Sequence, residues 1–199
     1  IIHTSVKTKQ GLDELNNTLY NQRSILVGQS GVGKSTIISI KAGENAIKKP
    51  NQTILIIASV ERQALLLFEK TLAYIHDNYK TYIKKGKDRP TKHTPTKHKI
   101  TLTNKSVIYC LPTGLSGYGI RGYTINQLYA DEAHFIPEDV WTAVTPMLAT
   151  TGGEIILLST PHGRTGYFYR CFQDKKFSQF HISSEECKRV PKDFLEAEK

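Results

Sequence analysis

The sequence has few residues that could crosslink the chain, bind a structural metal or anchor the chain in a membrane. Its 199 residues include three cysteines, and none of them belongs to a C-x-x-C pair. Three widely spaced cysteines (Cys110, Cys171 and Cys187) argue against a disulfide framework and predict reduced thiols in a cytosolic compartment. No run approaches the roughly 18 apolar residues of a membrane-spanning helix, and the N-terminus lacks the apolar core of a signal peptide.

The overall composition is that of a globular protein. Hydrophobic residues make up 39% of the chain and charged residues 23%, both ordinary values for a folded domain. The length suits one domain with a core of good size, or one domain with an appendage. The chain starts at an isoleucine rather than a methionine, which is compatible with a fragment of a longer protein.

The net charge of +9 is concentrated in one segment. Between Lys80 and Lys105 there are nine Lys or Arg residues and one acid, which gives this segment a charge of +8. Its prolines and low apolar content predict an exposed loop that leads into a strand. Such a loop either only aids solubility or contacts the phosphates of a nucleic acid without reading sequence. The candidate DNA contacts are Lys84, Lys85, Lys87 and Arg89.

The clearest motif is the stretch "ILVGQSGVGKSTII". It fits the Walker A pattern G-x-x-x-x-G-K-[ST], and it lies between a short apolar strand and an apolar helix, as this motif requires. Glycines let the backbone N–H groups surround anionic oxygens, Lys34 reaches the β- and γ-phosphates, and Ser35 binds Mg²⁺. The predicted nucleotide-binding residues are Gly28, Gln29, Ser30, Gly31, Val32, Gly33, Lys34, Ser35 and Thr36.

The rest of the chain alternates apolar strands with helical patterns. Continuous apolar runs such as "TILIIAS" and "EIILLSTP" are typical of strands that are covered on both faces. The segment "VERQALLLFEKTLAYIHDNY" has a helical period, and "KITLTNKSVIYCLP" predicts a hairpin around Asn104. These features predict an α/β fold with a mostly parallel sheet and helices on both faces.

The stretch "LYADEAH" supplies the second half of a nucleotide hydrolysis site, the Walker B element. An apolar strand brings Asp131 and Glu132 to its carboxyl end, where open α/β sheets bind ligands. We expect Asp131 to hold Mg²⁺ together with Ser35, and Glu132 to orient and deprotonate the attacking water.

The same residues argue for ATP rather than GTP. A GTPase of the switch type has a D-x-x-G turn after its metal-binding strand and an N-K-x-D element that reads guanine. The sequence has "DEAH" after this strand, and "NKSV" at residues 104–107 lacks the final aspartate. A hydrolytic glutamate next to the metal-binding aspartate, as in Asp131 and Glu132, resembles the ATP motors of the RecA-like, additional-strand class of P-loop NTPases. The predicted activity is therefore that of a P-loop ATPase with Mg²⁺ as its cofactor.

Two family resemblances are visible, in different parts of the chain. Residues from about 50 to 199 resemble the ATPase domain of the large terminase subunit of tailed bacteriophages. The stretches "ILIIASVERQALLLFEK" and "LYADEAHFIPEDVWTAVTPMLATTGGEIILLSTPHGRTGYFY" carry this resemblance. It implies ATP-driven packaging of double-stranded DNA by a homo-oligomeric ring, with a portal and a small terminase subunit as partners and no membrane. The implied location is the cytoplasm of an infected or prophage-bearing host cell.

The terminase resemblance also implies roles for individual residues. Ser159 and Thr160 match the coupling motif that senses the γ-phosphate. Arg121 matches the position of an arginine finger that acts on a neighbouring subunit, and Arg164 is a competitor for that role. The nuclease that usually follows such a motor is absent from this sequence, so no DNA cleavage is expected of it.

The front of the chain is similar to a different family. Residues 1–40, which include "TSVKTKQGLDELNNTLYNQRSILVGQSGVGKSTII", resemble the circularly permuted ribosome-assembly GTPases. In that family a guanine-contacting turn precedes the phosphate loop, and Ser5, Val6 and Lys7 stand at its place here. This resemblance makes a GTP-binding ribosome-assembly GTPase the alternative function. A third class, the two-domain DEAH-type helicases, needs a second RecA-like domain for which no residues remain.

The expected division of the chain follows from these two resemblances. We expect an N-terminal appendage over residues 1–24 that resembles a GTPase base-contact segment. The P-loop ATPase domain is expected over residues 25–185, and a C-terminal tail or linker toward the absent nuclease over residues 186–199.

Overall fold

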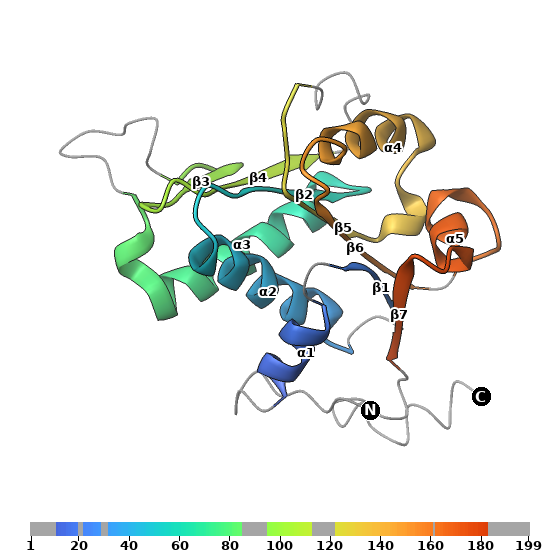
Figure 1. The fold of residues 1–199 in the computed structure, drawn as a ribbon, viewed down its shortest axis with the longest axis horizontal. Coiled ribbons are helices and arrows are strands. Elements are labelled where there is room, and N and C mark those ends of the chain that lie inside the picture. The colour runs from blue at the N-terminus through green and yellow to red at the C-terminus, as the bar shows by residue number, and fades with distance from the viewer. Residues whose placement is uncertain are drawn as a thin grey trace.

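The computed structural model describes residues 11–19, 22–28, 32–84, 95–112, 122–160 and 162–182, and the structural statements below concern these residues. They form one seven-stranded sheet in the order β3-β4-β2-β5-β6-β1-β7 (Figure 1). All neighbouring strands are parallel except β3, which runs antiparallel to β4 at one edge. The strands are β1 (Arg23–Gly28), β2 (Thr53–Ala58), β3 (Lys99–Thr101), β4 (Val107–Pro112), β5 (Gln127–Asp131), β6 (Glu154–Ser159) and β7 (Phe177–Ile182).

Helices cover both faces of the sheet (Figure 1). One core lies between the sheet and α1 (Leu12–Thr18), α2 (Lys34–Lys48) and α3 (Glu61–Tyr79), and includes Ile38 and Phe68. The other core lies beneath α4 (Glu138–Val144) and α5 (Gly166–Gln173), and includes Trp141 and Phe168. Three 3₁₀ turns complete the elements: η1 (Lys80–Tyr82), η3 (Ala133–Phe135) and η4 (Thr145–Leu148). The α/β fold with a mostly parallel sheet is confirmed.

The central strands have the composition that burial on both faces requires. In β2, residues 54–58 are all buried, and alternate side chains of this strand enter the two cores. In β5 the apolar Leu128 and Ala130 point into the α4–α5 core. The residues that alternate with them, from Gln127 to Asp131, are polar and buried. The two faces of β5 therefore differ in chemistry.

The predicted hairpin is confirmed, because Lys99–Thr101 pairs antiparallel with Val107–Tyr109. Its turn contains Lys105, whose φ of 71° is unusual for a residue other than glycine. Helix α4 ends at Val144, because Pro146 has no N–H to donate to the preceding turn. The chain there continues as the 3₁₀ turn η4.

Helix α1 was not anticipated from the sequence. Leu15 is 7% exposed and Leu19 is completely buried, and both belong to the core beneath α2 and α3. These residues come from the segment predicted to be an N-terminal appendage. The helix that contains Leu15 is thus packed onto the domain, while the proposed division of the chain into three parts stays a prediction.

Candidate functional site

The phosphate-loop end of the site is formed by the end of β1 and the start of α2. Gly33 is the N-cap of α2 and has a φ of 97°, a left-handed conformation that glycine adopts without strain. The N–H groups of Thr36 and Ile37 both donate to the Gly33 carbonyl oxygen. Of the predicted loop, Gly28 and residues 32–36 are described, whereas Gln29, Ser30 and Gly31 lie outside the described residues.

Lys34 is held inside this end of the site. Its side chain is 6% exposed, and its Nζ donates a hydrogen bond to the carbonyl oxygen of Gly28. Burial lowers the pKa of Lys34, and the nearby carboxylates of Glu132 and Asp131 oppose that shift. The lysine predicted to reach the phosphates therefore lies beside the two acids predicted to act on them.

Ser35 and Asp131 meet directly. Ser35 Oγ donates a hydrogen bond of 3.0 Å to Asp131 Oδ2, although the two residues are 96 positions apart in the sequence. A hydroxyl and a carboxylate oxygen are hard ligands of the kind that Mg²⁺ accepts, directly or through water. The predicted magnesium residues are thus at one place in the fold, and their chemistry fits that ion.

Glu132 follows Asp131 in a strained backbone conformation. Its φ of 48° and ψ of 45° are left-handed, which is uncommon outside glycine and asparagine. Its backbone N–H donates to Asp131 Oδ1 over 3.1 Å, which turns the chain sharply out of β5. Strained residues of this kind cluster at functional sites. The sequence did not predict this conformation.

Groups around the Glu132 carboxyl shift its pKa in opposite directions. Burial raises its pKa, and the neighbouring Asp131 carboxylate raises it further. The Lys34 ammonium group and a hydrogen bond from the Thr160 backbone N–H lower it, but the net shift is upward. A carboxyl with a raised pKa is better suited to accept a proton near neutral pH than an ordinary glutamate.

The end of β6 contacts this acid pair. The Ser159 side chain is completely buried, and its Oγ accepts a hydrogen bond of 3.3 Å from the backbone N–H of His134. Thr160 reaches Glu132 through its own backbone N–H. Two links therefore connect the carboxyl ends of β5 and β6. The sequence analysis selected these two residues because they match a coupling motif. It missed both backbone donors, the N–H groups of His134 and Thr160, which no sequence pattern reveals.

A small aromatic cluster lies beside the same strand ends. The rings of His134, Phe135 and His162 are 5.2 to 5.3 Å apart between centroids, and Phe135 is 50% exposed. Burial lowers the pKa of His134, and His162 lowers it further. The sequence analysis assigned no role to this cluster.

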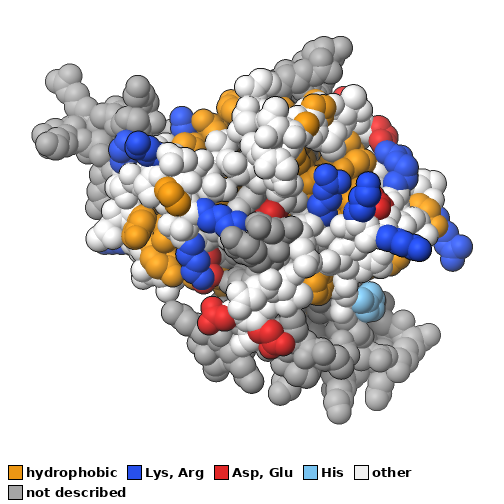
Figure 2. All heavy atoms as spheres, viewed as in Figure 1, with side chains coloured by type: hydrophobic (Ala, Val, Ile, Leu, Met, Phe, Trp, Pro, Cys, Tyr) orange, Lys and Arg blue, Asp and Glu red, His pale blue; other side chains and the backbone are white. Residues whose placement is uncertain are grey.

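Two other groups of predicted residues are only partly described. Arg121, the predicted finger, lies outside the described residues, whereas Arg164 is described and exposed. Of the four candidate DNA contacts only Lys84 is described; its N–H donates to the Thr101 carbonyl oxygen over 3.1 Å. Lys84 therefore lies beside the end of β3. Figure 2 shows Lys and Arg side chains spread across the middle of the face in view, from the α3 side to the α5 side.

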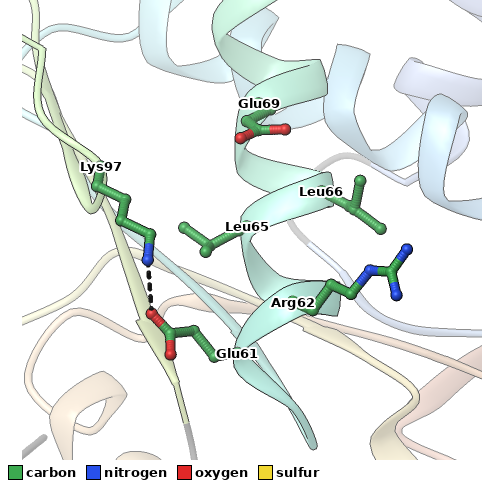
Figure 3. A pocket seen from close by; sticks show the side chains of 6 residues that line it. All are labelled: Glu61, Arg62, Leu65, Leu66, Glu69 and Lys97. Carbon is green, nitrogen blue, oxygen red and sulfur yellow. Dashed lines mark hydrogen bonds and ion pairs between the residues drawn. The ribbon is translucent and has the colours of Figure 1, made fainter.

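Two surface grooves lie away from the acid pair. A shallow groove of about 310 Å³ runs along α3. There Leu65 and Glu61 face Lys97, while Arg62 and Leu66 point away from it (Figure 3). Lys97 Nζ lies 3.2 Å from Glu61 Oε1. A second groove of about 580 Å³ follows α2 and α3 and has mixed charge. Neither groove contains Asp131 or Glu132.

The strand order identifies the class of protein. Strand β6 lies between β1, which leads to the phosphate loop, and β5, which presents the acids. This inserted strand, the G-x-x-x-x-G-K-[ST] pattern and the paired acids define a P-loop NTPase of the RecA-like, additional-strand class. In the described part of the chain, no helix is long and apolar enough to cross a membrane.

The profile of the RsgA GTPase family matches residues 1–109, more than half of the chain, and the chain belongs to this family. Over 37 residues it is 62% identical to the small ribosomal subunit biogenesis GTPase RsgA of Saccharophagus degradans. Over 40 residues it is 50% identical to the RsgA of Borrelia recurrentis. These matches cover 19% and 20% of this chain, and the chain spans only 11% and 13% of those proteins' length.

The whole fold is similar to a different set of structures. The large terminase ATPase domain of Thermus phage P74-26 aligns with a TM-score of 0.72 at 20% identity, covering 92% of this chain and 85% of that one. The large terminase of a thermophilic bacteriophage, in complex with ADP, aligns with a TM-score of 0.69 at 15% identity, over 90% and 45% of the two chains. The Phi-28 gp11 DNA packaging motor gives 0.53 at 12% identity, over 93% and 65%. These likenesses establish the fold.

The two comparisons meet at the nucleotide site. The matched span of the GTPase profile contains the phosphate loop, Lys34 and Ser35 but ends before Asp131, Glu132 and Ser159. Both resemblances seen in the sequence are confirmed. What they share is a P-loop nucleotide hydrolase.

Proposed function

We propose that this domain hydrolyses ATP and couples the hydrolysis to movement of double-stranded DNA, as in the packaging of a phage genome into a capsid. The observation that carries the proposal is the acid pair on β5, separated from the phosphate-loop strand by β6, with Asp131 in contact with Ser35. This arrangement leaves Glu132 free to act on water while Asp131 acts on the metal site.

The chain's own residues account for each part of the reaction. The phosphate loop and Lys34 would bind and orient the triphosphate, and Glu132 would take the proton of the attacking water. When bound, Mg²⁺ would supply positive charge at the phosphate oxygens, held by Ser35 and Asp131. Ser159 and Thr160 would transmit the change at the γ-phosphate, because they are tied to His134 and Glu132 at the end of β5.

The assembly and the location belong to the same proposal. The names of the structural neighbours, large terminase and DNA packaging motor, support action on DNA in an assembly. The form of that assembly that we propose is a homo-oligomeric ring with a portal and a small terminase subunit as partners. Arg121 would act as a finger on the neighbouring subunit, and the segment with Lys84, Lys85, Lys87 and Arg89 would contact the DNA backbone. The proposed location is the cytoplasm of an infected or prophage-bearing host cell.

A second candidate function is that of a ribosome-assembly GTPase. The match of the RsgA GTPase profile over residues 1–109 favours it. The absence of D-x-x-G after Asp131 and the incomplete N-K-x-D at residues 104–107 speak against it.

Direct comparison of the two nucleotides separates these candidates. Titration with fluorescent analogues of Mg-ATP and Mg-GTP, followed by steady-state hydrolysis of each unlabelled nucleotide, should show tighter binding and faster turnover with ATP. Tighter binding of GTP, with GTP hydrolysis stimulated by small ribosomal subunits and not by DNA, would establish the GTPase candidate instead.

A further inference from the structure

Helix α2 carries a row of buried polar residues that the nucleotide chemistry does not use. Lys41 is 1% exposed and Asn45 is 8% exposed. Lys49, one turn further on, has its Nζ 3.2 Å from Glu154 Oε1. Residues four apart lie on one face of a helix, so these three side chains form a stripe. Lysine and asparagine are seldom buried unless partners hold them.

The partners of this stripe lie at the starts of β5 and β6. Asn45 Nδ2 donates to Gln127 Oε1 and to the Tyr129 hydroxyl, each over 3.2 Å. The Tyr129 hydroxyl in turn donates to Gln127 Oε1 over 2.9 Å. Glu154, which is in register with Gln127 on the next strand, pairs with Lys41 at 3.9 Å and with Lys49. The buried polar cluster is therefore Lys41 and Asn45 of α2, Gln127 and Tyr129 of β5, and Glu154 of β6. The partly exposed Lys49, the C-cap of α2, closes it on the solvent side.

The buried polar cluster and the nucleotide site lie at opposite ends of the same pair of elements. Gln127, Tyr129 and Asp131 alternate along β5 and so face α2 together. Ser35 meets Asp131 at one end, and Asn45 meets Gln127 at the other. The ten residues from Ser35 to Asn45 span about 15 Å of helix, and the four from Gln127 to Asp131 span about 13 Å of strand. The helix is thus tied to the strand at two matching points.

The contacts between those two points are apolar and have little directional preference. Ile38, Ala42 and Ala46 lie in the core that α2 shares with the sheet. Dispersion and burial stabilise this packing but change little when a helix shifts along a strand. Buried hydrogen bonds respond differently from apolar contacts. A shift of the helix along the strand would separate donors from acceptors, and each unpaired buried group would cost a large free energy. The cluster therefore selects one axial position of α2.

We propose that Asn45, Gln127 and Tyr129 are positioning residues, which set the distance between Ser35 and Asp131 by fixing α2 along β5. This inference rests on the proposed role of Ser35 and Asp131 in holding Mg²⁺. Lys34 is the first residue of α2, and Gly33 of the phosphate loop is its N-cap, so both would move with the helix. Binding of a nucleotide without metal therefore depends little on the cluster. Metal binding spans α2 and β5, so it depends on their relative position.

The test replaces the polar side chains by apolar ones of similar shape. In the variant Asn45→Leu, Gln127→Met and Tyr129→Phe, both partners of each hydrogen bond are removed together, which is often nearly neutral for stability. A non-hydrolysable fluorescent ATP analogue is titrated in EDTA and again across a series of Mg²⁺ concentrations. We expect the affinity in EDTA to change less than about twofold, and the half-saturating Mg²⁺ concentration to rise about tenfold or more, as when outer-shell partners of a metal site are lost.

The matched control is Tyr74→Phe. Tyr74 lies on α3, and its hydroxyl donates a hydrogen bond of 2.9 Å to Glu44 Oε1 on α2. Its loss removes one hydroxyl at the α2–α3 contact without touching β5, so the Mg²⁺ dependence should match that of the unaltered protein. A folded triple variant with unchanged Mg²⁺ dependence would overturn the inference, and so would an equal loss in the control.

A single substitution covers the case in which the triple variant does not fold. Tyr129→Phe keeps the ring and the bond between Asn45 and Gln127, and we expect a smaller rise in the half-saturating Mg²⁺ concentration with unchanged affinity in EDTA. Unchanged Mg²⁺ dependence in this variant would also overturn the inference. If Mg²⁺ does not increase the affinity of the unaltered protein for the nucleotide, the proposed metal site at Ser35 and Asp131 is rejected. That result is distinct from a change of Mg²⁺ dependence in the variants, which tests the role of the buried polar cluster.

Discussion

Ser35 Oγ and Asp131 Oδ2 are joined by a hydrogen bond of 3.0 Å that brings the first turn of α2 to the end of β5. The contact joins the part of the chain matched by the GTPase profile to the part that lies beyond it. Neither half contains a complete hydrolysis site. In the proposed function, the nucleotide chemistry of this domain therefore depends on how α2 is placed against β5.

Replacing either of these two residues should separate nucleotide binding from metal-dependent hydrolysis. Asp131→Asn keeps the size of the side chain but removes the charge that attracts Mg²⁺, so turnover should fall by about 10²-fold or more. Ser35→Ala should raise the Mg²⁺ concentration required and leave Mg²⁺-free binding nearly unchanged. Hydrolysis of ATP measured across Mg²⁺ concentrations checks both variants, and unchanged Mg²⁺ requirements would remove this pair from the metal site.

Glu132→Gln should bind nucleotide and nearly stop turnover. The amide keeps the shape of the carboxyl but cannot accept a proton from water, so single-turnover hydrolysis should fall by about 10²–10⁴-fold. Because the pKa of Glu132 is raised above its ordinary value of 4.5, the rate in the unaltered protein should decline on the acid side at a pH above that value. A variant that hydrolyses at the unaltered rate would exclude Glu132 as the base.

The same substitution should also affect stability. A carboxyl whose pKa is raised by folding contributes stability that is present below its unfolded pKa and is lost as the pH rises through its folded pKa. At neutral pH the ionised Glu132 therefore destabilises the nucleotide-free protein. Glu132→Gln should raise the thermal midpoint at pH 7 by about a degree or more and have less effect at pH 4. Thermal unfolding of both proteins at the two pH values measures this difference.

The basic segment should give DNA binding a steep salt dependence. Binding to duplex DNA is expected to weaken with salt at a slope of about 0.9 per phosphate contacted, without sequence preference. Reversing the charge at Lys84, Lys85 and Lys87 to glutamate should flatten that slope. Fluorescence anisotropy across a salt series measures it.

A control for this experiment reverses three exposed lysines elsewhere. Lys70, Lys175 and Lys176 are all exposed and lie outside the basic segment. Their reversal to glutamate changes the net charge of the protein by the same amount. An equal effect of both triple variants would assign the slope to net charge and reject a specific role for the segment.

Arg121 should act across subunits. The phosphate loop, Lys34, Asp131 and Glu132 can bind ATP and orient water within one chain, whereas an arginine finger is worth about 10³–10⁵-fold in rate. The isolated domain should therefore bind ATP and hydrolyse it slowly. Mixing Glu132→Gln subunits with Arg121→Ala subunits should restore activity that neither variant has alone. No restoration, with mixed assembly shown separately, would place Arg121 in its own site or on DNA.

Local patterns were enough to predict most of the fold. The strand, glycine loop and helix around Lys34 follow from one motif whose residues each have a physical reason. The apolar runs that became β2 and β6 are buried on both faces, as their composition requires. Helix α1 was missed because its short sequence, with Asn16 and Asn17, has weak helix propensity and is stabilised by the burial of Leu15.

The parts of the site that the sequence did not reveal depend on tertiary contacts. The sequence does not predict the left-handed backbone conformation of Glu132. The strain of that conformation is offset by the hydrogen bond from its backbone N–H to the Asp131 carboxylate, which only the structure shows. Lys41 and Glu154 look like surface residues in the sequence, since charged residues are mostly exposed. The structure shows that Lys41 and Glu154 are buried where α2 packs across β5 and β6.

The pairing of β7 with β1 has a mechanical consequence. The two strands are parallel and in register along their whole length, so that Ile182 lies beside Gly28, where the chain enters the phosphate loop. A pull on the chain beyond Ile182, directed along β7, would load the hydrogen bonds of this ladder in shear. Bonds loaded in shear resist together, whereas bonds peeled from one end yield one at a time. We expect β7 to transmit tension directly to β1, the strand that leads to the phosphate loop. A mechanical load on the chain and a bound nucleotide would then both act on the end of β1.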